Sequence, residues 1–242
     1  MHWMLKKYLG KIKICTVTKN IIITLIGDYM SFSLESIGME EGARYEAIYT
    51  TMDNDGEMDA APIGVKCIND YDVAARIFEG SKTLENIRQT KLFVVNITDN
   101  PQIYADALYG NLENLQFVRD DDIAYLKNAD AYFICLVKSI EELEAQKDHV
   151  NDGEKSYIVI AENIKITINK KGAKALNRGL FAYLESLVDY SRADIIDDDK
   201  KQEYSTRFLE NERLIERVAE KDVKESMKVL KEKMIEKGLD LD

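Results

Sequence analysis

The chain has 242 residues and a formal net charge of −11, and 45% of its residues are hydrophobic. A chain of this length can bury a substantial core, either as one large domain or as a domain with a smaller appendage. The acidity argues against a broad nucleic-acid-binding surface, because phosphate backbones are bound by clustered lysines and arginines. A ligand of nucleotide size needs only a local positive region.

The cysteines and histidines restrict the chemistry further. Cys15, Cys67 and Cys135 are odd in number and show no paired spacing, which indicates reduced thiols and a cytoplasmic location. With only His2 and His149 in the sequence, we expect no histidine-based metal site. The apolar run from Ile21 to Ile26 is too short for a signal peptide or a membrane span, so we expect no membrane association.

The first thirty residues differ from the rest in charge, because they carry five lysines and one aspartate. We interpret residues 1–30 as an upstream or non-native extension and expect the natural start at Met30 or Met39. The remaining sequence divides into two regions, which we expect to be residues 31–170 and residues 171–242.

From Arg44 onward, short runs rich in Val, Ile, Tyr and Phe are separated by Asp, Asn and Gly. This pattern is typical of a meandering β-barrel or sandwich. The strands that it predicts are Tyr45–Thr51, Pro62–Cys67, Val73–Phe78, Leu92–Thr98, Ala131–Ser139 and Tyr157–Ile168. Two short helices are expected between them, Thr83–Gln89 and Pro101–Tyr109, the second preceded by a good capping residue, Asn100.

The stretch from Thr50 to Gly64 combines a tight turn with a run of small residues. Residues 54–56, Asn-Asp-Gly, predict a hairpin connection, because all three tolerate a left-handed backbone. The acidic residues of this turn do not have the spacing of a calcium-binding loop. Pro62 is expected at a strand start, on an edge or a bulge, where small neighbours leave the backbone open to a planar ring. Alternatively, Pro62 only protects an edge strand from aggregation.

A second candidate is the segment Gly80-Ser81-Lys82-Thr83, which follows a predicted strand and opens a predicted helix. It lacks the glycines of a Walker motif. Free backbone N–H groups, two hydroxyls and a lysine are nevertheless a good receptacle for a phosphate. The alternative is a simple capping segment, because Ser and Thr are favoured at any helix N-terminus.

Other polar residues lie at strand positions that a ligand could reach. Thr50 and Thr51 are adjacent, so one points into the core and the other outward, where it could hydrogen-bond a ligand. Asn96 to Asp99 place polar groups where the fourth strand ends. The sequence shows no nucleophile with an associated base and no Gly-x-Ser-x-Gly elbow.

After Lys171 the apolar residues recur every three or four positions, which predicts three helices. The acidic run 197–199 marks the break between the first two. The apolar stripes of these helices are either core or dimer contact.

Three blocks of the sequence carry a family resemblance: "YEAIYTTMDNDGEMDAAPIGV", "RIFEGSKTLENIRQTKLFVVNITDNP" and "LNRGLFAYLESLVDYSR". Together they resemble an archaeal family of uncharacterised flavin-binding proteins with the split-barrel fold of flavin reductases and pyridoxamine-phosphate oxidases. The resemblance runs from about Tyr45 to Arg192. It implies a mainly β, α+β protein: an FMN-binding split β-barrel in residues 31–170 and a C-terminal helical region in residues 171–242, forming a homodimer.

The resemblance also implies positions for the cofactor contacts. The open backbone of Ala61, Pro62, Ile63 and Gly64 would lie along the flavin ring. The remaining candidates are the neighbouring strand residues Thr50 and Thr51, the phosphate segment Ser81, Lys82 and Thr83, Asn86 on the same helix, and the strand-end residues Asn96 and Thr98. Asn177, Arg178 and Arg192 lie in the third block, without an assigned contact.

Three functions follow as alternatives. The first is a cytoplasmic FMN-dependent oxidoreductase or flavin reductase of unknown substrate, with a nicotinamide as a possible electron donor. The second is a flavin carrier or sensor without turnover. The third is an interaction module without a cofactor, in which residues 80–83 only cap a helix.

Overall fold

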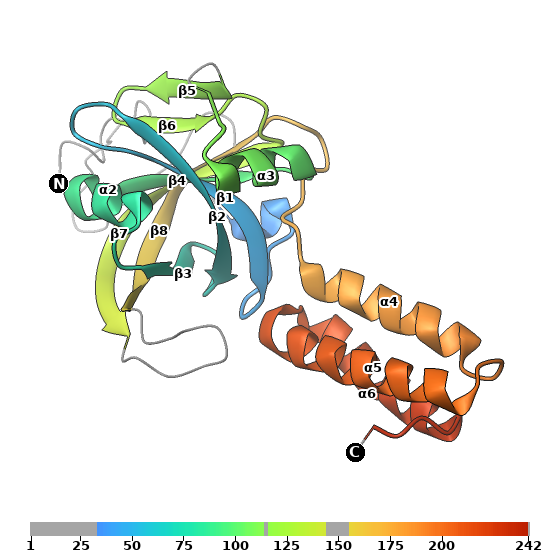
Figure 1. Ribbon diagram of the computed structural model, residues 1–242. Helices are drawn as coiled ribbons and strands as arrows, with labels where there is room; N and C mark the ends of the chain where they lie inside the picture. The colour runs from blue at the N-terminus through green and yellow to red at the C-terminus, as the bar shows by residue number, and fades with distance from the viewer. Residues whose placement is uncertain (1–32, 114–115, 144–154, 242) are drawn as a thin grey trace, which may run out of the picture.

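The computed structural model describes residues 33–113, 116–143 and 155–241 (Figure 1). The interpretation of residues 1–30, and the loop that holds His149, lie outside the described residues. Six antiparallel strands form a closed barrel with the strand order β1-β2-β3-β8-β7-β4. Their bounds are β1 Arg44–Met52, β2 Met58–Cys67, β3 Asp72–Phe78, β4 Leu92–Ile97, β7 Ala131–Leu143 and β8 Ser156–Ile168. All six predicted strands are confirmed.

Side chains along each strand point alternately into the barrel interior and towards its outer face. On β1, Tyr45, Ala47 and Tyr49 point inward and join a large buried apolar cluster. The Tyr49 ring stacks on Phe93 of β4, with 5.1 Å between the ring centroids. Strands with one buried face require this period of two, because a shift of one residue would expose the whole apolar set.

The predicted hairpin between β1 and β2 is confirmed. Gly56 takes a φ of +89°, a left-handed conformation that side chains rarely adopt. The Asp53 carboxylate accepts hydrogen bonds from the backbone N–H groups of Asp55 and Glu57 and so closes the turn. The two strands then pair from Met52 opposite Met58 to Arg44 opposite Lys66.

β2 is paired unequally on its two edges. One edge follows β1 over the whole strand, but the other meets β3 only at Lys66–Ala74 and Cys67–Val73, although both strands are fully described. β3 instead pairs along its full length with β8. We call the unpaired length between β2 and β3 the split. The sequence analysis predicted Pro62 at the start of a strand, but it lies within β2. Because Pro62 lies on the part of β2 that borders the split, its missing N–H leaves no gap in a ladder with β3.

Short elements close the two sides of the barrel. The helices α2 (Lys82–Thr90) and α3 (Pro101–Tyr109) begin after the capping side chains of Ser81 and Asn100, as predicted. The hairpin β5–β6 (Phe117–Asp120 and Ile123–Leu126) packs on the outer face of β1 and β4, and a short 3₁₀ helix, η1 (Leu34–Ile37), precedes β1. The sequence analysis missed these last two elements.

The C-terminal region consists of three packed helices that extend away from the barrel (Figure 1): α4 (Arg178–Arg192), α5 (Asp198–Val218) and α6 (Lys221–Glu236). Their core is built from the predicted stripes of α5 and α6, including Phe208, Ile215, Met227 and Met234. On α4, in contrast, the predicted stripe is partly on the surface. Of the described helices, none combines the length and apolarity needed to cross a bilayer.

A hydrogen bond from a side chain of the barrel core contributes to holding the helical region in place. The Tyr45 hydroxyl donates to Glu220 Oε1 at 2.8 Å and accepts from the Glu40 backbone N–H at 2.7 Å. Tyr45 is completely buried in the barrel, and Glu220 is the residue before α6. Burial raises the pKa of the Tyr45 phenol, so the group acts here as a neutral donor.

Candidate functional site

The predicted ring-binding residues lie on the part of β2 that borders the split. Ala61, Pro62 and Ile63 are partly exposed, and Gly64 is exposed on the outer face. A Cβ placed on Gly64 would meet only the Tyr45 carbonyl oxygen, at 3.9 Å. The absence of a side chain at Gly64 is therefore not required by packing within the chain, and it leaves open space beside the strand.

The predicted phosphate segment lies at the far end of the split and is tied to the β1–β2 hairpin. Lys82 Nζ lies 3.0 Å from Asp53 Oδ2, and the Thr83 hydroxyl donates to Asp59 Oδ2 at 2.9 Å. The pairing raises the pKa of Lys82 and lowers the pKa of Asp53, mainly through their mutual hydrogen bond. Ser81 accepts from the Leu84 N–H as the helix cap. A phosphate that binds here has to displace the Asp53 carboxylate from Lys82 and the Asp59 carboxylate from Thr83.

Asn86 and Thr51 form a buried pair behind the phosphate segment. Asn86 Nδ2 donates to the Thr51 hydroxyl at 3.0 Å, and both side chains are shielded from solvent. The Asn86 Oδ1 atom has no hydrogen-bond partner among the described residues. A buried acceptor without a partner is costly, so this atom has unused hydrogen-bonding capacity near the split; among the described residues the buried Tyr49 hydroxyl, opposite Ala61, shares this property.

Thr50, Asn96 and Thr98 lie elsewhere, under the β5–β6 hairpin and α3. Asn96 Nδ2 donates to the Ile48 carbonyl and to the Thr50 hydroxyl, both at 3.0 Å, and its Oδ1 accepts from the Leu126 N–H at 2.8 Å. Thr50 in turn donates to the Ala124 carbonyl. Thr50 does point outward, but β6 covers it, so its hydroxyl serves the barrel. Thr98 accepts from the Asn100 N–H in the turn before α3.

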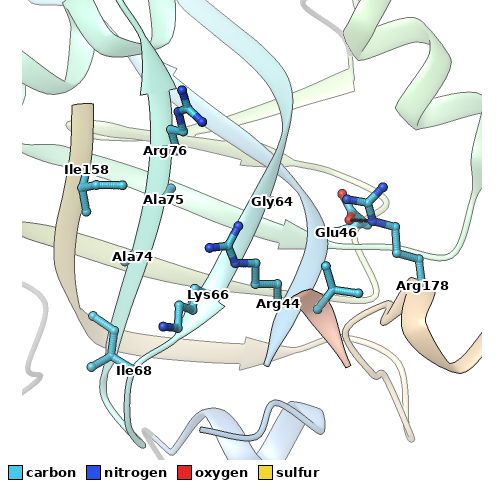
Figure 2. A pocket seen from close by; sticks show the side chains of 11 residues that line it. Arg44, Glu46, Gly64, Lys66, Ile68, Ala74, Ala75, Arg76, Ile158 and Arg178 are labelled. Atoms are coloured by element: carbon cyan, nitrogen blue, oxygen red, sulfur yellow. Dashed lines mark ion pairs between the residues drawn. The ribbon is translucent and has the colours of Figure 1, made fainter. Parts of the chain in front are cut away.

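A cavity of about 540 Å³ opens on the outer face of β1, β2 and β3, between the barrel and the helical region (Figure 2). Gly64 is the one predicted site residue in its lining. The lining residues are Arg44, Glu46, Gly64, Lys66, Ile68, Ala74, Ala75, Arg76, Ile158, Arg178 and Val218. Four of them are cations and one is a carboxylate, although the whole chain has a charge of −11.

The cations of this cavity differ in their partners. Arg178, at the start of α4, pairs with Glu46 of β1 at 2.8 Å. Arg76 donates to the Ser156 hydroxyl at 3.0 Å and lies over the Phe78 ring. Arg44 and Lys66 form no ion pair with any described residue. The sequence analysis missed Arg44, Lys66 and Arg76 as site residues. Lys66 and Arg76 lie on predicted strands and Arg44 lies just before one, and these positions were the signal that could have found them.

Groups for acid–base or covalent chemistry are not assembled in this cavity. The nearest thiol, Cys67, is buried, and burial raises its pKa to about 11. Within residues 33–113, 116–143 and 155–241, no three His, Cys, Asp or Glu side chains converge to hold a metal ion. What the cavity presents is a set of cationic side chains between small or apolar walls.

A six-stranded antiparallel barrel, split between β2 and β3 and extended by a helical region beside a cationic cavity, defines the class: a split-barrel protein. The chain belongs to the DUF447 family. Residues 45–170 match the family described as "Protein of unknown function (DUF447) N-terminal domain", and residues 177–232 match its C-terminal counterpart, "Protein of unknown function (DUF447)". The predicted membership of an archaeal family is confirmed.

Relatives and solved structures with similarity to the chain come from archaea and bacteria. "Uncharacterized protein MJ1453" of Methanocaldococcus jannaschii is 30% identical over 162 residues, which are 65% of this chain and 81% of the relative. FMN-bound protein MM1853 from Methanosarcina mazei, described as a DUF447 protein, is 25% identical, with 83% of this chain and 99% of that chain covered and a TM-score of 0.47. Nitrilotriacetate monooxygenase component B from Bacillus cereus is 15% identical, with 69% and 90% covered and a TM-score of 0.44.

Proposed function

We propose that this protein binds FMN along the split between β2 and β3 and acts as a flavin-dependent oxidoreductase. The observation that carries the proposal is the unpaired edge of β2 from Ala61 to Gly64, which borders a cation-lined cavity in an acidic protein. The shared family supports it, because MM1853, another DUF447 protein, is described as FMN-bound.

The residues of the split fit a flavin in shape and in polarity. Gly64 leaves the space that a planar ring needs, and the backbone beside Pro62 is free of ladder partners on the split side. Ser81, Lys82 and Thr83 would hold the phosphate at the start of α2, after exchange of their present carboxylate partners. Asn86 and its unpaired Oδ1 would support the polar edge of the cofactor from beneath.

The other predicted residues do not contact FMN in this proposal but support the residues and strands around it. Thr51 orients Asn86, and Thr50, Asn96 and Thr98 fix the strands β1 and β4 against the β5–β6 hairpin. Bound FMN supplies electron transfer, and the protein supplies orientation, hydrogen bonds and control of solvent. A nicotinamide as electron donor and a cytoplasmic location also belong to the proposal; the free, buried thiols of Cys67 and Cys135 agree with a reducing compartment.

The homodimer is part of the same proposal. Four large apolar side chains of α4 lie on one side of the helix and are 41–54% exposed: Leu180, Phe181, Leu184 and Val188. An exposed apolar patch of this kind on a regular helix fits a twofold contact, in which the same patch of each subunit meets its copy.

Visible absorption spectra test the proposed function. The protein is measured as purified, and again after incubation with FMN and removal of the excess. A structured, shifted flavin band is the expected result, followed by its bleaching on anaerobic addition of NADH or NADPH. A protein that stays colourless would overturn the proposal. A protein that keeps bound flavin oxidised with every donor would retain flavin binding and refute the oxidoreductase.

A further inference from the structure

Two cations of the cavity face each other across the β1–β2 ladder. Arg44 and Lys66 are direct cross-strand partners on the outer face of the barrel, and both side chains are exposed. Like charges in directly opposite positions destabilise an antiparallel pair. Among the described residues, no carboxylate compensates either of them. The fold therefore carries a repulsive pair that an anionic ligand would relieve.

The adjoining strand and helix add to the same positive region. Ala74 of β3 is the partner of Lys66 on its other edge, which places Arg76 two residues further along on the same face. Figure 2 shows Arg44 and Lys66 near each other on β1 and β2, Arg76 further along β3, and Arg178 of α4 on the opposite side of Arg44, beside Glu46. The single lining carboxylate, Glu46, is already bound to Arg178.

The walls between these cations are small or apolar. Ile68, Ala74, Ala75, Ile158 and Val218 line the cavity together with the cations. Low-dielectric walls concentrate the field of a charge cluster and strengthen its attraction for a counter-ion. Guanidinium groups also present paired N–H donors that match phosphate and carboxylate oxygens.

This cluster is separate from the segment proposed to hold the FMN phosphate. Thr83 contacts Asp59, near the start of β2, whereas Lys66 lies near its end. Lys66 lies seven residue steps beyond Asp59 along an extended strand, a distance of roughly 23 Å at about 3.3 Å per step. One phosphate group cannot contact both ends of the strand.

We propose that Arg44 and Lys66, with Arg76 and Arg178 at the border, form a second anion subsite that binds the phosphate or diphosphate of the molecule that meets the flavin. The inference rests on the proposed function for the flavin itself. Phosphate chemistry of this kind is shared by a nicotinamide dinucleotide and by a small phosphorylated substrate. Either would be held by its anionic group at the cluster, with its remaining part directed along β2 towards Gly64.

The test is calorimetric titration of inorganic pyrophosphate at low ionic strength, into the protein without flavin and into the FMN-loaded protein. The variant R44Q/K66Q is compared with the control K127Q/K228Q, which has the same net charge. Lys127 and Lys228 are exposed, lie outside the cavity and form no ion pair with described residues. FMN affinity is measured for each protein by quenching of flavin fluorescence.

We expect pyrophosphate to bind the wild-type and control proteins, and to bind R44Q/K66Q at least tenfold more weakly, with FMN affinity unchanged within about twofold. Displacement of pyrophosphate by NADH would support the subsite and assign it to a dinucleotide. Displacement by inorganic phosphate but not by NADH would support it and assign it to a small phosphorylated substrate.

Four results would overturn parts of the inference separately. Failure of the wild-type protein to bind pyrophosphate, or an equal loss in the control variant, would refute the subsite. A parallel tenfold loss of FMN affinity in R44Q/K66Q would show that these cations hold the flavin phosphate itself. Pyrophosphate binding at Arg44 and Lys66 in a protein that never takes up FMN would refute the proposed function and the subsite's link to flavin, but not anion binding.

Discussion

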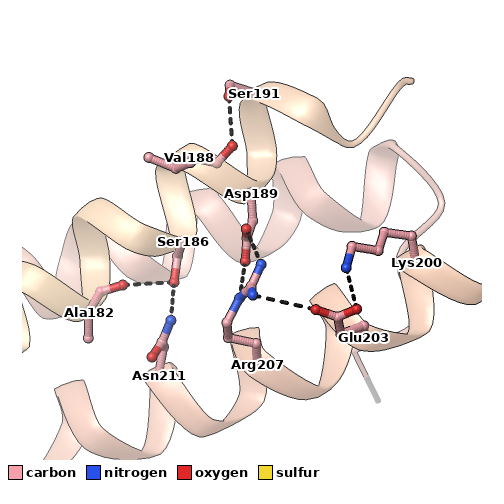
Figure 3. Close-up of polar contacts among 9 residues, drawn as sticks. All are labelled: Ala182, Ser186, Val188, Asp189, Ser191, Lys200, Glu203, Arg207 and Asn211. Carbon is pink, nitrogen blue, oxygen red and sulfur yellow. Dashed lines mark hydrogen bonds and ion pairs between the residues drawn. The ribbon is translucent and has the colours of Figure 1, made fainter. Parts of the chain in front are cut away.

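Arg207 of α5 donates two parallel hydrogen bonds to the carboxylate of Asp189 on α4 (Figure 3). Asp189 is 3% exposed, so its carboxylate oxygens have this side chain in place of solvent as their partner. The contact raises the pKa of Arg207, and Glu203 approaches the same guanidinium from the solvent side. A bidentate pair fixes both distance and rotation, and so sets the register of the two helices.

Replacing Arg207 with Met should therefore destabilise the helical region. The substitution leaves the buried Asp189 carboxylate without its partner, and breaking such a pair costs about 3 kcal/mol. Urea unfolding followed by circular dichroism measures the loss. The control is Glu203→Gln, which removes only an exposed partner and should cost less than about 0.5 kcal/mol. Equal effects of the two substitutions would contradict this account of the pair.

Asn96→Leu should lower the stability of the barrel in the absence of any ligand. The substitution leaves the Leu126 N–H without its buried partner, at a cost of about 1–3 kcal/mol, and removes a side-chain donor from the Ile48 carbonyl and the Thr50 hydroxyl. Thermal unfolding of the flavin-free protein measures it. Asn100→Ala, which removes only the exposed cap of α3, should cost about 1 kcal/mol. If Asn96→Leu kept its melting temperature and lost FMN affinity, Asn96 would be a ligand contact and not a structural one.

Gly64→Val should weaken FMN binding by at least tenfold and leave the flavin-free protein nearly as stable as the wild type. The new side chain enters open space beside the split, and valine is favoured in strands. Gly56→Val should do the opposite: a Cβ at Gly56 would lie 2.6 Å from Arg119 Nη1, and the φ of +89° is strained for valine. Fluorescence titration and thermal unfolding separate the two effects. A large stability loss for Gly64→Val would make Gly64 a structural glycine.

Leu184→Glu should convert the proposed dimer into a monomer, because it places a charge in the middle of the exposed apolar side of α4. Light scattering coupled to size-exclusion chromatography measures the mass. Val229→Glu on α6 is the matched control, since Val229 is also exposed, at 58%, but lies on a different helix. The α4 contact would be refuted if the wild-type protein had the mass of a single chain, or if both variants dissociated to the same extent.

Cys67 should be nearly unreactive in the folded protein at pH 8. With a pKa of about 11, it has a roughly 100-fold smaller thiolate fraction than a free cysteine, and the thiolate is the reactive form. Because the unfolded thiol ionises first, this group also makes folding less favourable as the pH rises from about 9 towards 11. Iodoacetamide labelling with peptide mass spectrometry, in buffer and in denaturing urea, measures the rates. Similar rates in both would show that Cys67 is accessible.

The barrel was predictable from local patterns, whereas the cavity was not. Alternating apolar residues define the six strands, and the Asn-Asp-Gly turn defines the first hairpin, because both signals lie within a few neighbouring residues. The strands β5 and β6 have four residues each and are separated by acidic residues, so their pattern is too short to recognise. Arg44, Lys66, Arg76 and Arg178 come together only through strand register and the docking of α4, which one sequence does not specify.

The hydrogen bond between Tyr45 and Glu220 also bears on the cavity. Arg44 and Lys66 belong to the barrel, whereas Arg178 and Val218 belong to the helical region, so the width of the cavity depends on how the two regions are held. Tyr45 has no freedom to follow the helices, because its ring is packed in the barrel core. The width of this cavity is thus fixed in part from inside the barrel, through Tyr45, which is not among the residues that line it.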